Sequence, residues 1–542
     1  MTFHRSMTLG LAAALMASSA LAEAHMTTHP ETGEALAEDQ TFSYRLLDDW
    51  ASIDPQLVEE TVGSTVVRDL FEGLYNSGPT GELEPGVALS HEVSDDNKVY
   101  TFTLRDDARW SNGDPVTAND FVYGIRRAAD PATASPYGWY VELTSIQNAA
   151  AVLAGEMPPE ELGVKAIDDH TLEITLEKSL PYFPLMTTYA TLFPAPQATV
   201  EEFGDQWTRP ENIVTNGAYT LTEYRPGERH VRTKSDTYWN ADEVIITETT
   251  GLVINDEQQA LTRYFAGETD MTDDLPTGSY PELLAEYPDQ AHSVPRLCSY
   301  YYALNLSDSG PEALKDPNVR RALSLAVDRD VIVKQIIKGG QTPAYTFAHP
   351  GTAGYQMPDV EMAGMTQAER DAEAKRLMEE AGVTDLTMRL SYNTSDAHEQ
   401  IATIVGQMWK QKLGVNTTLE NYEWKTFLDI RDQQDFDVSR AAWCADYNEA
   451  SSFLDLLTTN NGNNDGKYSN ARVDELMEAA ATSSDPQPMY TEVEEILAEE
   501  TAVIPIYHYS LAFMLKPDIE GWPYENAENN WYSRQLYRVA SE

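Results

Sequence analysis

Apolar and polar residues alternate over residues 100–104 (YTFTL) and 172–176 (LEITL). Successive side chains of a β-strand point to opposite faces, so each stretch predicts a strand with one buried face. Residues 44–53 predict a further strand that runs into a turn at Asp54-Pro55.

Other stretches space their apolar residues three and four positions apart, which is typical of one face of a helix. The clearest are residues 66–74, 319–327 and 401–413, and residues 114–127 predict another helix with its cap near Asp114-Pro115. Helices and strands alternate along the whole chain, which predicts α/β domains with mixed sheets. Because no short repeat or low-complexity linker interrupts the pattern, we expect lobes that are interleaved in sequence.

The first 22 residues have the pattern of a secretory signal peptide. Arg5 supplies a positive charge, an apolar run covers residues 9–17, and Ala20-Leu21-Ala22 is an A-x-A cleavage pattern. We expect cleavage after Ala22 and a polar, mobile leader up to about residue 40. No cysteine follows the cleavage pattern to carry a lipid, and no later run of about 20 apolar residues could anchor the chain. The interpretation is a periplasmic protein without membrane insertion, and full secretion is the alternative.

Charge and length narrow the class of protein. A chain of 542 residues predicts two to four domains. Its 88 acidic and 37 basic residues give a formal charge of −51. Nucleic acids and anionic membranes attract basic surfaces, so both are excluded as partners. The charge predicts a strongly solvated acidic surface instead.

The chain contains two cysteines, Cys298 and Cys444. An even count in an exported protein favours a disulfide between them, and two buried free thiols are the alternative.

Motifs for catalysis and for metal or phosphate binding are missing from the sequence. There is no G-x-S-x-G elbow and no glycine-rich phosphate loop. His398-Glu399 begins a zinc-protease pattern, but Ala402 stands where the second histidine would be. No Cys/His cluster has metal-ligand spacing. We therefore expect neither catalytic residues, nor a metal, nor a cofactor.

Several segments together resemble the oligopeptide/dipeptide-binding family of ABC-importer receptors, solute-binding family 5. The most recognisable is YTFTLRDDARWSNGDPVTANDFVYGIRRAADP at residues 100–131. Further matches are RDLFEGLY (68–75), NIVTNGAY (212–219) and NVRRALSLAVDRDVIV (318–333). Two more segments resemble the oligopeptide receptors in particular: LCSYYYALN (297–305) and residues 423–453, which include RAAWCADYNE.

The resemblance implies a two-lobed periplasmic-binding-protein fold, type II-like, with a hinge and an extra small domain. The expected domain I begins within residues 23–61, continues over 197–297 and returns at 514–542. Domain II is expected over 62–196 and domain III over 298–513. A monomer would hold a short extended peptide between the lobes and deliver it to a membrane permease.

The resemblance also implies site residues. Asp446 would bind the peptide α-amino group, because a buried ammonium needs a carboxylate partner. Arg440, Arg431 and His398 would bind the peptide carboxylate. The resemblance further implies two strand edges that pair with the peptide backbone: Ala442, Trp443 and Cys444 on one side, and Asp49 and Trp50 on the other. It also implies aromatic walls for the side-chain pockets, formed by Tyr137, Trp424, Trp443 and Tyr301.

Two departures from the family pattern leave the peptide length open. Asp432 stands where the enterobacterial receptors have histidine, and their cleft lysine has no clean match near residues 335–338. The alternatives to a peptide receptor are the same fold with another solute, such as an opine, a sugar or a murein peptide, and an exported hydrolase.

Overall fold

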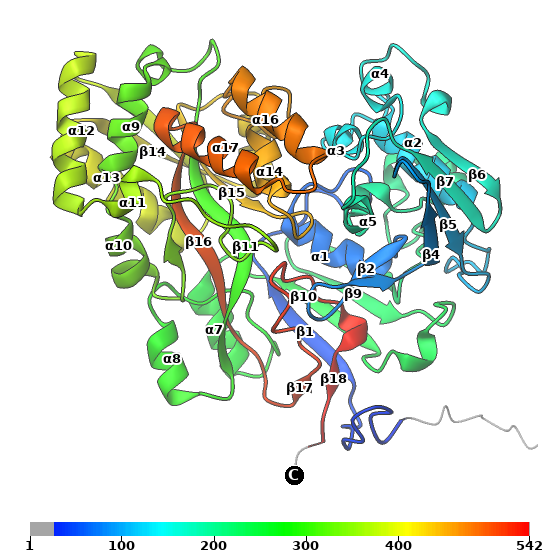
Figure 1. Cartoon of the computed structure of the whole chain (residues 1–542). Helices are drawn as coiled ribbons and strands as arrows, with labels where there is room; N and C mark the ends of the chain where they lie inside the picture. The colour runs from blue at the N-terminus through cyan, green and yellow to red at the C-terminus, as the bar shows by residue number, and fades with distance from the viewer. Residues whose placement is uncertain (1–25, 541–542) are drawn as a thin grey trace, which may run out of the picture.

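The computed structural model describes residues 26–540 and has the predicted α/β architecture, with mixed sheets arranged in two lobes (Figure 1). The signal peptide and its cleavage after Ala22 lie outside the described residues. Two small strand pairs accompany the larger sheets: β2 (Tyr75–Ser77) with β3 (Leu83–Pro85), and β17 (Ile519–Glu520) with β18 (Tyr537–Arg538).

The first sheet lies in the lobe that contains the C-terminal segment. Its order is β1-β10-β9-β8, and β1 pairs parallel with β10 while the other neighbours are antiparallel. The strands are β1 (Thr41–Leu46), β8 (Tyr219–Arg225), β9 (Arg229–Lys234) and β10 (Glu248–Val253). The expected strand over residues 44–53 therefore ends at Leu46. Nearby helices are α1 (Thr61–Leu70), α7 (Glu257–Phe265) and α8 (Tyr280–Glu286), whereas α6 (Gln197–Phe203) contacts the helix Ala118–Ala129 of the next sheet.

The second sheet is antiparallel, in the order β4-β5-β7-β6. Its strands are β4 (Ala88–Val93), β5 (Val99–Leu104), β6 (Val164–Asp168) and β7 (Thr171–Thr175). The alternation seen in the sequence is confirmed: the apolar positions of β5 and β7 are buried. The accompanying helices are α2 (Ala118–Ala129), α3 (Gly138–Leu143), α4 (Ala149–Leu153) and α5 (Phe183–Met186).

Helix α2 begins four residues later than the sequence predicts. Pro115 pairs with Arg109 in an isolated bridge, so residues 114–116 are not helical. The helix instead starts behind Thr117, where Thr117 and Asp120 form a capping box.

The third sheet is the largest, in the order β12-β16-β11-β15-β13-β14. Its strands are β11 (Ala291–Leu304), β12 (Thr342–Pro343), β13 (Thr387–Asn393), β14 (Asn416–Tyr422), β15 (Val438–Cys444) and β16 (Val503–Met514). The expected helices over 319–327 and 401–413 are α9 (Pro317–Leu325) and α13 (Asp396–Leu413). Other helices of this lobe are α10 (Arg329–Val331), α11 (Glu361–Gly364), α12 (Gln367–Ala381), α14 (Trp424–Asp432), α15 (Ser451–Leu454), α16 (Ala471–Ala481) and α17 (Gln487–Glu500).

Two long antiparallel strands, β11 and β16, run from the largest sheet toward the region of α7 and α8 (Figure 1). Their upper parts pack into the core of the largest sheet, and their lower parts pack with β1 and the C-terminal segment. The expected domain limits at 298 and 513 both fall inside these continuous strands. The passage between lobes is therefore made by strand rather than by loop.

The described part of the expected leader contacts the C-terminal segment. Leu36 is buried and forms a bridge with Val539, and the Ala37 amide donates to the carbonyl of Arg538 at 2.9 Å. These contacts join the two ends of the described chain.

A buried ion pair ties α1 to the first sheet. Asp69 and Arg232 lie 2.7 Å apart, and both side chains are almost fully buried. The amide and hydroxyl of Ser533 also donate to the Asp69 carboxylate. One carboxylate thus holds together a helix, a strand and the C-terminal segment. No helix among residues 26–540 is both long enough and apolar enough to cross a membrane.

Replacing Asp69 by Asn is expected to lower the free energy of unfolding by about 3–5 kcal/mol, because Arg232 would remain buried without its counter-charge. Denaturant unfolding of D69N measures this loss. Arg225, which is 58% exposed in its own ion pair, provides the control: R225Q should change stability by less than about 1 kcal/mol. Equal losses in both variants would contradict the role given to the buried pair.

Candidate ligand-binding cavity

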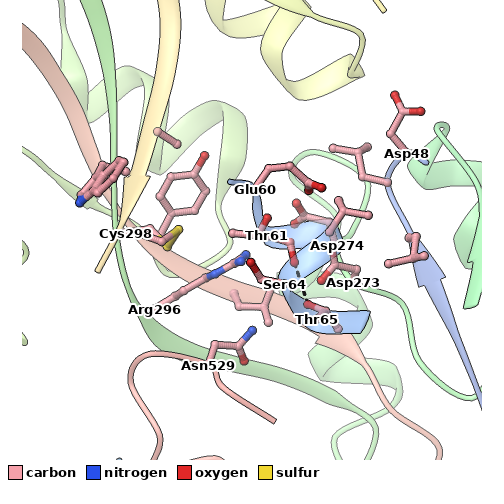
Figure 2. A pocket seen from close by; sticks show the side chains of 18 of the residues that line it. Asp48, Glu60, Thr61, Ser64, Thr65, Asp273, Asp274, Arg296, Cys298 and Asn529 are labelled. Carbon is pink, nitrogen blue, oxygen red and sulfur yellow. Dashed lines mark hydrogen bonds between the residues drawn. A yellow bond between two sulfur atoms is a disulfide. The ribbon is translucent and has the colours of Figure 1, made fainter. Parts of the chain in front are cut away.

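A cavity of about 310 Å³ lies between the lobes, a size within the usual range for small-ligand sites. Its wall is assembled from β1, α1, β11, α14, β15 and the C-terminal segment. Residues that are more than 450 positions apart in the sequence, such as Tyr44 and Trp531, therefore line the same cavity. Figure 2 shows part of the wall, with side chains from several of these elements directed into the same space.

Strand β15 presents a free backbone edge to the cavity. Neighbouring β13 pairs with β15 only at Val438 and Ser439. On its other side β15 pairs antiparallel with β11, and the Ala445 amide donates to the Leu297 carbonyl at 2.8 Å. Hydrogen-bonded pairs alternate along such a ladder, so Trp443 bonds to β11 as well. Ala442 and Cys444 then turn their N–H and C=O groups to the free edge.

Asp446 lies two residues beyond the end of β15 and is 9% exposed. Burial raises the pKa of its carboxyl well above the usual range, and the Tyr137 hydroxyl, which donates to it at 3.3 Å, opposes this only in part. Neither Lys, Arg nor His lies within 4.0 Å of this carboxylate in the described chain. Asp446 is an enclosed acid without a cation.

Arg440 is the reverse case, an enclosed cation without an acid. It is 8% exposed, and its side chain donates to the Asn393 amide oxygen at 3.3 Å and to the Tyr509 hydroxyl at 3.0 Å. Both partners are neutral, and the guanidinium also lies over the ring of Tyr300. Its charge remains available to an anion.

Arg431 and His398, the two other residues expected to bind the peptide carboxylate, also line the cavity, but neither offers a free positive charge. Arg431 forms an ion pair with Asp465, so its charge is already balanced. Burial holds the pKa of the His398 imidazole well below its usual range, and nearby Arg440 lowers it further. The surroundings of His398 therefore favour the neutral imidazole, because a second positive charge beside Arg440 would be costly.

Among the expected aromatic walls, Tyr137, Trp424 and Trp443 line the cavity. Tyr301 does not: it is 2% exposed and packs edge-on against Phe347 in the core.

The second expected backbone edge also needs correction. Trp50 stacks on Tyr224 within the first lobe, and the Asp49 carboxylate accepts from the Tyr224 hydroxyl at 2.8 Å. Neither residue lines the cavity. The chain reaches the cavity slightly earlier, at Leu46, Leu47 and Asp48, because β1 ends at Leu46.

Several charged residues of the wall were not identified from the sequence. They have no common periodicity or motif, and they meet only because the lobes bring distant segments together. They are Arg45, Asp48, Glu59, Glu60, Arg68, Glu257, Asp273, Asp274, Arg296, Asp465 and Glu528. Burial raises the pKa values of Glu59, Glu60, Asp274 and Glu528 to about 7.

The expected disulfide is confirmed: Cys298 and Cys444 are bonded and face each other directly across the β11–β15 ladder. It closes a separation of 146 residues. The bond fixes the end of β15 next to Asp446. Across residues 26–540, no group of three or more His, Cys, Asp or Glu side chains could hold a metal ion.

Aromatic contacts connect the two sides of the cavity. The ring of Tyr182 stacks on Tyr447 with centroids 5.7 Å apart, and the rings of Trp139 and Trp443 lie 6.1 Å apart. Tyr182 and Trp139 belong to the region of the small sheet, whereas Trp443 and Tyr447 belong to or follow β15. These contacts join the small-sheet region to the lobe that carries β15.

Residues 82–465 match the profile of the bacterial extracellular solute-binding proteins, family 5. The chain belongs to this family. It is 42% identical to the periplasmic oligopeptide-binding protein OppA of Escherichia coli, over 98% of this chain and 97% of that protein. The family is one of solute-binding proteins, which agrees with the enclosed cavity between the lobes.

Solved structures of another relative, the murein tripeptide-binding protein MppA of Escherichia coli, agree with the fold. One covers 93% of this chain and 100% of its own, with 40% identity and a TM-score of 0.91. Its unliganded open form, at the same identity and covering 94% of this chain and 99% of its own, gives a TM-score of 0.68. The structure of this chain is thus more similar to the first of these two than to the unliganded open form.

Replacing both Cys298 and Cys444 by Ser is expected to lower the free energy of unfolding, by up to about 4–5 kcal/mol in the chain-entropy account of a loop this long. Urea unfolding of C298S/C444S measures the loss. Wild type treated with a reductant is the matched control and should shift by the same amount. An unchanged urea midpoint in the variant would show that the bond does not brace β15.

Proposed function

We propose that this protein is the periplasmic substrate-binding component of an ABC importer and that it binds short peptides in extended form between its lobes. The observation that carries the proposal is Asp446: an enclosed carboxyl without a cation, next to a free strand edge and braced by a disulfide. The relationship to OppA supports the choice of peptide as solute.

The α-amino group of the peptide binds Asp446. An ammonium supplies the counter-charge that the carboxyl lacks, and it lets Asp446 ionise inside the closed cavity. The Tyr137 hydroxyl, 3.3 Å from the carboxylate, completes the polar surroundings.

The peptide backbone pairs with the free edge of β15. The N–H and C=O groups of Ala442 and Cys444 offer hydrogen bonds that any peptide sequence can satisfy. Leu46 to Asp48 approach from the other lobe and take the place that we expected for Asp49 and Trp50. Because these hydrogen bonds involve only the peptide backbone, the protein accepts peptides with different side chains.

The peptide carboxylate binds Arg440, whose guanidinium has only neutral partners. His398 contributes as a neutral imidazole rather than as a cation. Arg431 contributes N–H groups, since Asp465 already balances its charge. Trp424, Trp443 and Tyr137 form apolar walls for the side chains of the guest.

Delivery to a membrane permease, export with cleavage after Ala22, a monomeric state and the absence of catalysis complete the proposal. The supporting observations are the relationship to periplasmic solute-binding proteins and the A-x-A pattern at Ala20-Leu21-Ala22.

Native mass spectrometry of protein purified without refolding tests the function directly. Retained guests should form a mass ladder of short peptides. Thermal unfolding with a pool of di- to pentapeptides should show a raised melting temperature, because a ligand stabilises only the state that binds it. A shift with an opine or a sugar, and none with any peptide, would refute peptide as the solute. Peptide turnover on long incubation would indicate a hydrolase.

Replacing Asp446 by Asn is expected to abolish the preference for peptides with a free amino group. Wild type should bind a free peptide more tightly than its N-acetyl form by about 2–5 kcal/mol, the usual cost of breaking a buried charge pair. In D446N the two forms should bind with similar, weak affinity. Asp205 is exposed and does not line the cavity, so D205N is the matched control and should keep the preference. Calorimetry with both peptides on all three proteins decides the assignment.

Peptide affinity is expected to fall as the solution becomes acidic. The pKa of Asp446 is raised without a guest, and an ammonium partner lowers it, so the complex holds fewer protons than the free protein. Binding therefore releases a proton and strengthens as pH rises, until the peptide amino group deprotonates near pH ~8. Calorimetry in two buffers of different ionisation enthalpy counts the proton. D446N should release less, and an equal count would assign the proton to a neighbour such as Glu528.

A further inference from the structure

Two arginines of the cavity wall, Arg68 on α1 and Arg296 on β11, have no acidic partner. Neither guanidinium has a carboxylate oxygen within 4.0 Å in the part of the chain that the structure describes. The two lie close enough for Arg296 to lower the pKa of Arg68, in addition to the larger effect of burial. Two guanidinium groups that line one cavity repel each other, and within the described residues they lack an anion between them.

Arg296 is directed into the cavity by a break in the β11–β16 ladder. The register between these strands shifts between Pro295 and Ser299, and the Leu297 amide donates to the Ala527 carbonyl at 2.7 Å instead. Such bulges turn a side chain out of the normal strand alternation. Figure 2 shows the Arg296 side chain extending from β11 toward α1. Its Nε atom is buried and has no hydrogen-bond partner among the described residues.

Arg68 also makes few polar contacts within the described chain. Its side chain donates to the Thr65 hydroxyl at 3.3 Å, and its Nε atom is buried without a partner within residues 26–540. Its sequence neighbour Asp69 cannot neutralise it, because that carboxylate is 2.7 Å from Arg232 and also accepts from Ser533.

The nearby carboxyls do not complete the pair either. Glu528 accepts from the Ser77 hydroxyl at 2.9 Å, and burial raises its pKa to about 7. Asp274 also has a pKa of about 7 and accepts no hydrogen bond from the described residues, although Arg296 is among its neighbours. Both carboxyls are therefore partly protonated near neutral pH. Ser64 and Asn529 line the same part of the cavity with uncharged polar groups.

We propose that Arg68 and Arg296 form a second carboxylate-binding site for the guest, which takes the acidic side chain of an Asp or Glu residue. The inference rests on the proposed function and adds to it a preference for peptides with an acidic side chain at one position. Two guanidinium forks that converge on one space match the geometry of a carboxylate. Binding an anion there also relieves the repulsion between the two arginines.

The terminal carboxylate of the peptide is the other possible occupant. Arg440 is the better partner for that group, because it lies on β15 itself, where the paired backbone of the guest runs. Its surroundings, Asn393, Tyr509 and His398, are separate from those of Arg68 and Arg296. This separation leaves a side chain as the occupant of the second site.

A positional scan tests the proposal. Alanine tetrapeptides that carry one Glu at each position in turn are compared with their Gln twins by calorimetry. At one position the Glu peptide should bind wild type about tenfold more tightly, a difference of about 1.4 kcal/mol. In R296Q and in R68Q this ratio should fall toward one, whereas the affinity for the Gln twin should hardly change. R296K, which keeps the charge without the fork, should retain part of the ratio.

R225Q removes one surface charge outside the cavity and should keep the full ratio. Melting temperatures of all variants exclude unfolding as the cause of a loss. If peptides bind but Glu and Gln twins are equal at every position, or if the ratio survives in both R296Q and R68Q, the second site is refuted while the proposed function stands. C-terminally amidated twins form the second arm: a preference for the free acid that depends on Arg296 would refute the side-chain assignment. Failure of every tetrapeptide to bind would refute the proposed function itself.

Discussion

A charge enclosed by protein must be paired, neutralised by a change of protonation, or left for a ligand, because desolvation makes an isolated ion costly. All three solutions occur in this structure. Asp69 with Arg232 and Asp465 with Arg431 are paired. The His398 imidazole is neutral because burial lowers its pKa. Arg440 and Arg296 have no acidic partner, Asp446 has a raised pKa and no cation, and all three line one cavity.

The sheet architecture explains why these groups remain free. Strand β15 lies in the middle of the largest sheet but loses its partner β13 after Ser439, so its last residues are an edge inside the protein. The disulfide and the β11 ladder hold this edge in place from the other side. A free edge is usually a liability for aggregation, and here the second lobe covers it. The edge is thus protected from other proteins and open to a guest.

The free groups define a guest by features that do not depend on most of its sequence. An acid next to the strand edge matches an amino terminus, an arginine on the same strand matches a carboxyl terminus, and the edge matches a backbone. Only the pair of Arg68 and Arg296 adds a side-chain preference. The aromatic walls supply apolar area with little loss of side-chain entropy, which suits guests of varied shape. The cavity therefore accepts peptides of many sequences, with a preference for an acidic side chain beside Arg68 and Arg296.

The sequence by itself determined the α/β class, the strands at residues 100–104 and 172–176, the helices α9 and α13, and the placement of Asp446, Arg440 and the disulfide in one strand region. These features are local: periodicity follows from the geometry of strands and helices, and a motif keeps its residues together wherever the strand goes. Only the tertiary structure decided which charges are balanced and which side chains reach the cavity. Arg431 meets Asp465, Tyr301 meets Phe347, and Trp50 meets Tyr224, each through contacts that no spacing encodes. The burial that neutralises His398 and the bulge that turns Arg296 inward arise in the same way, from the packing of distant segments.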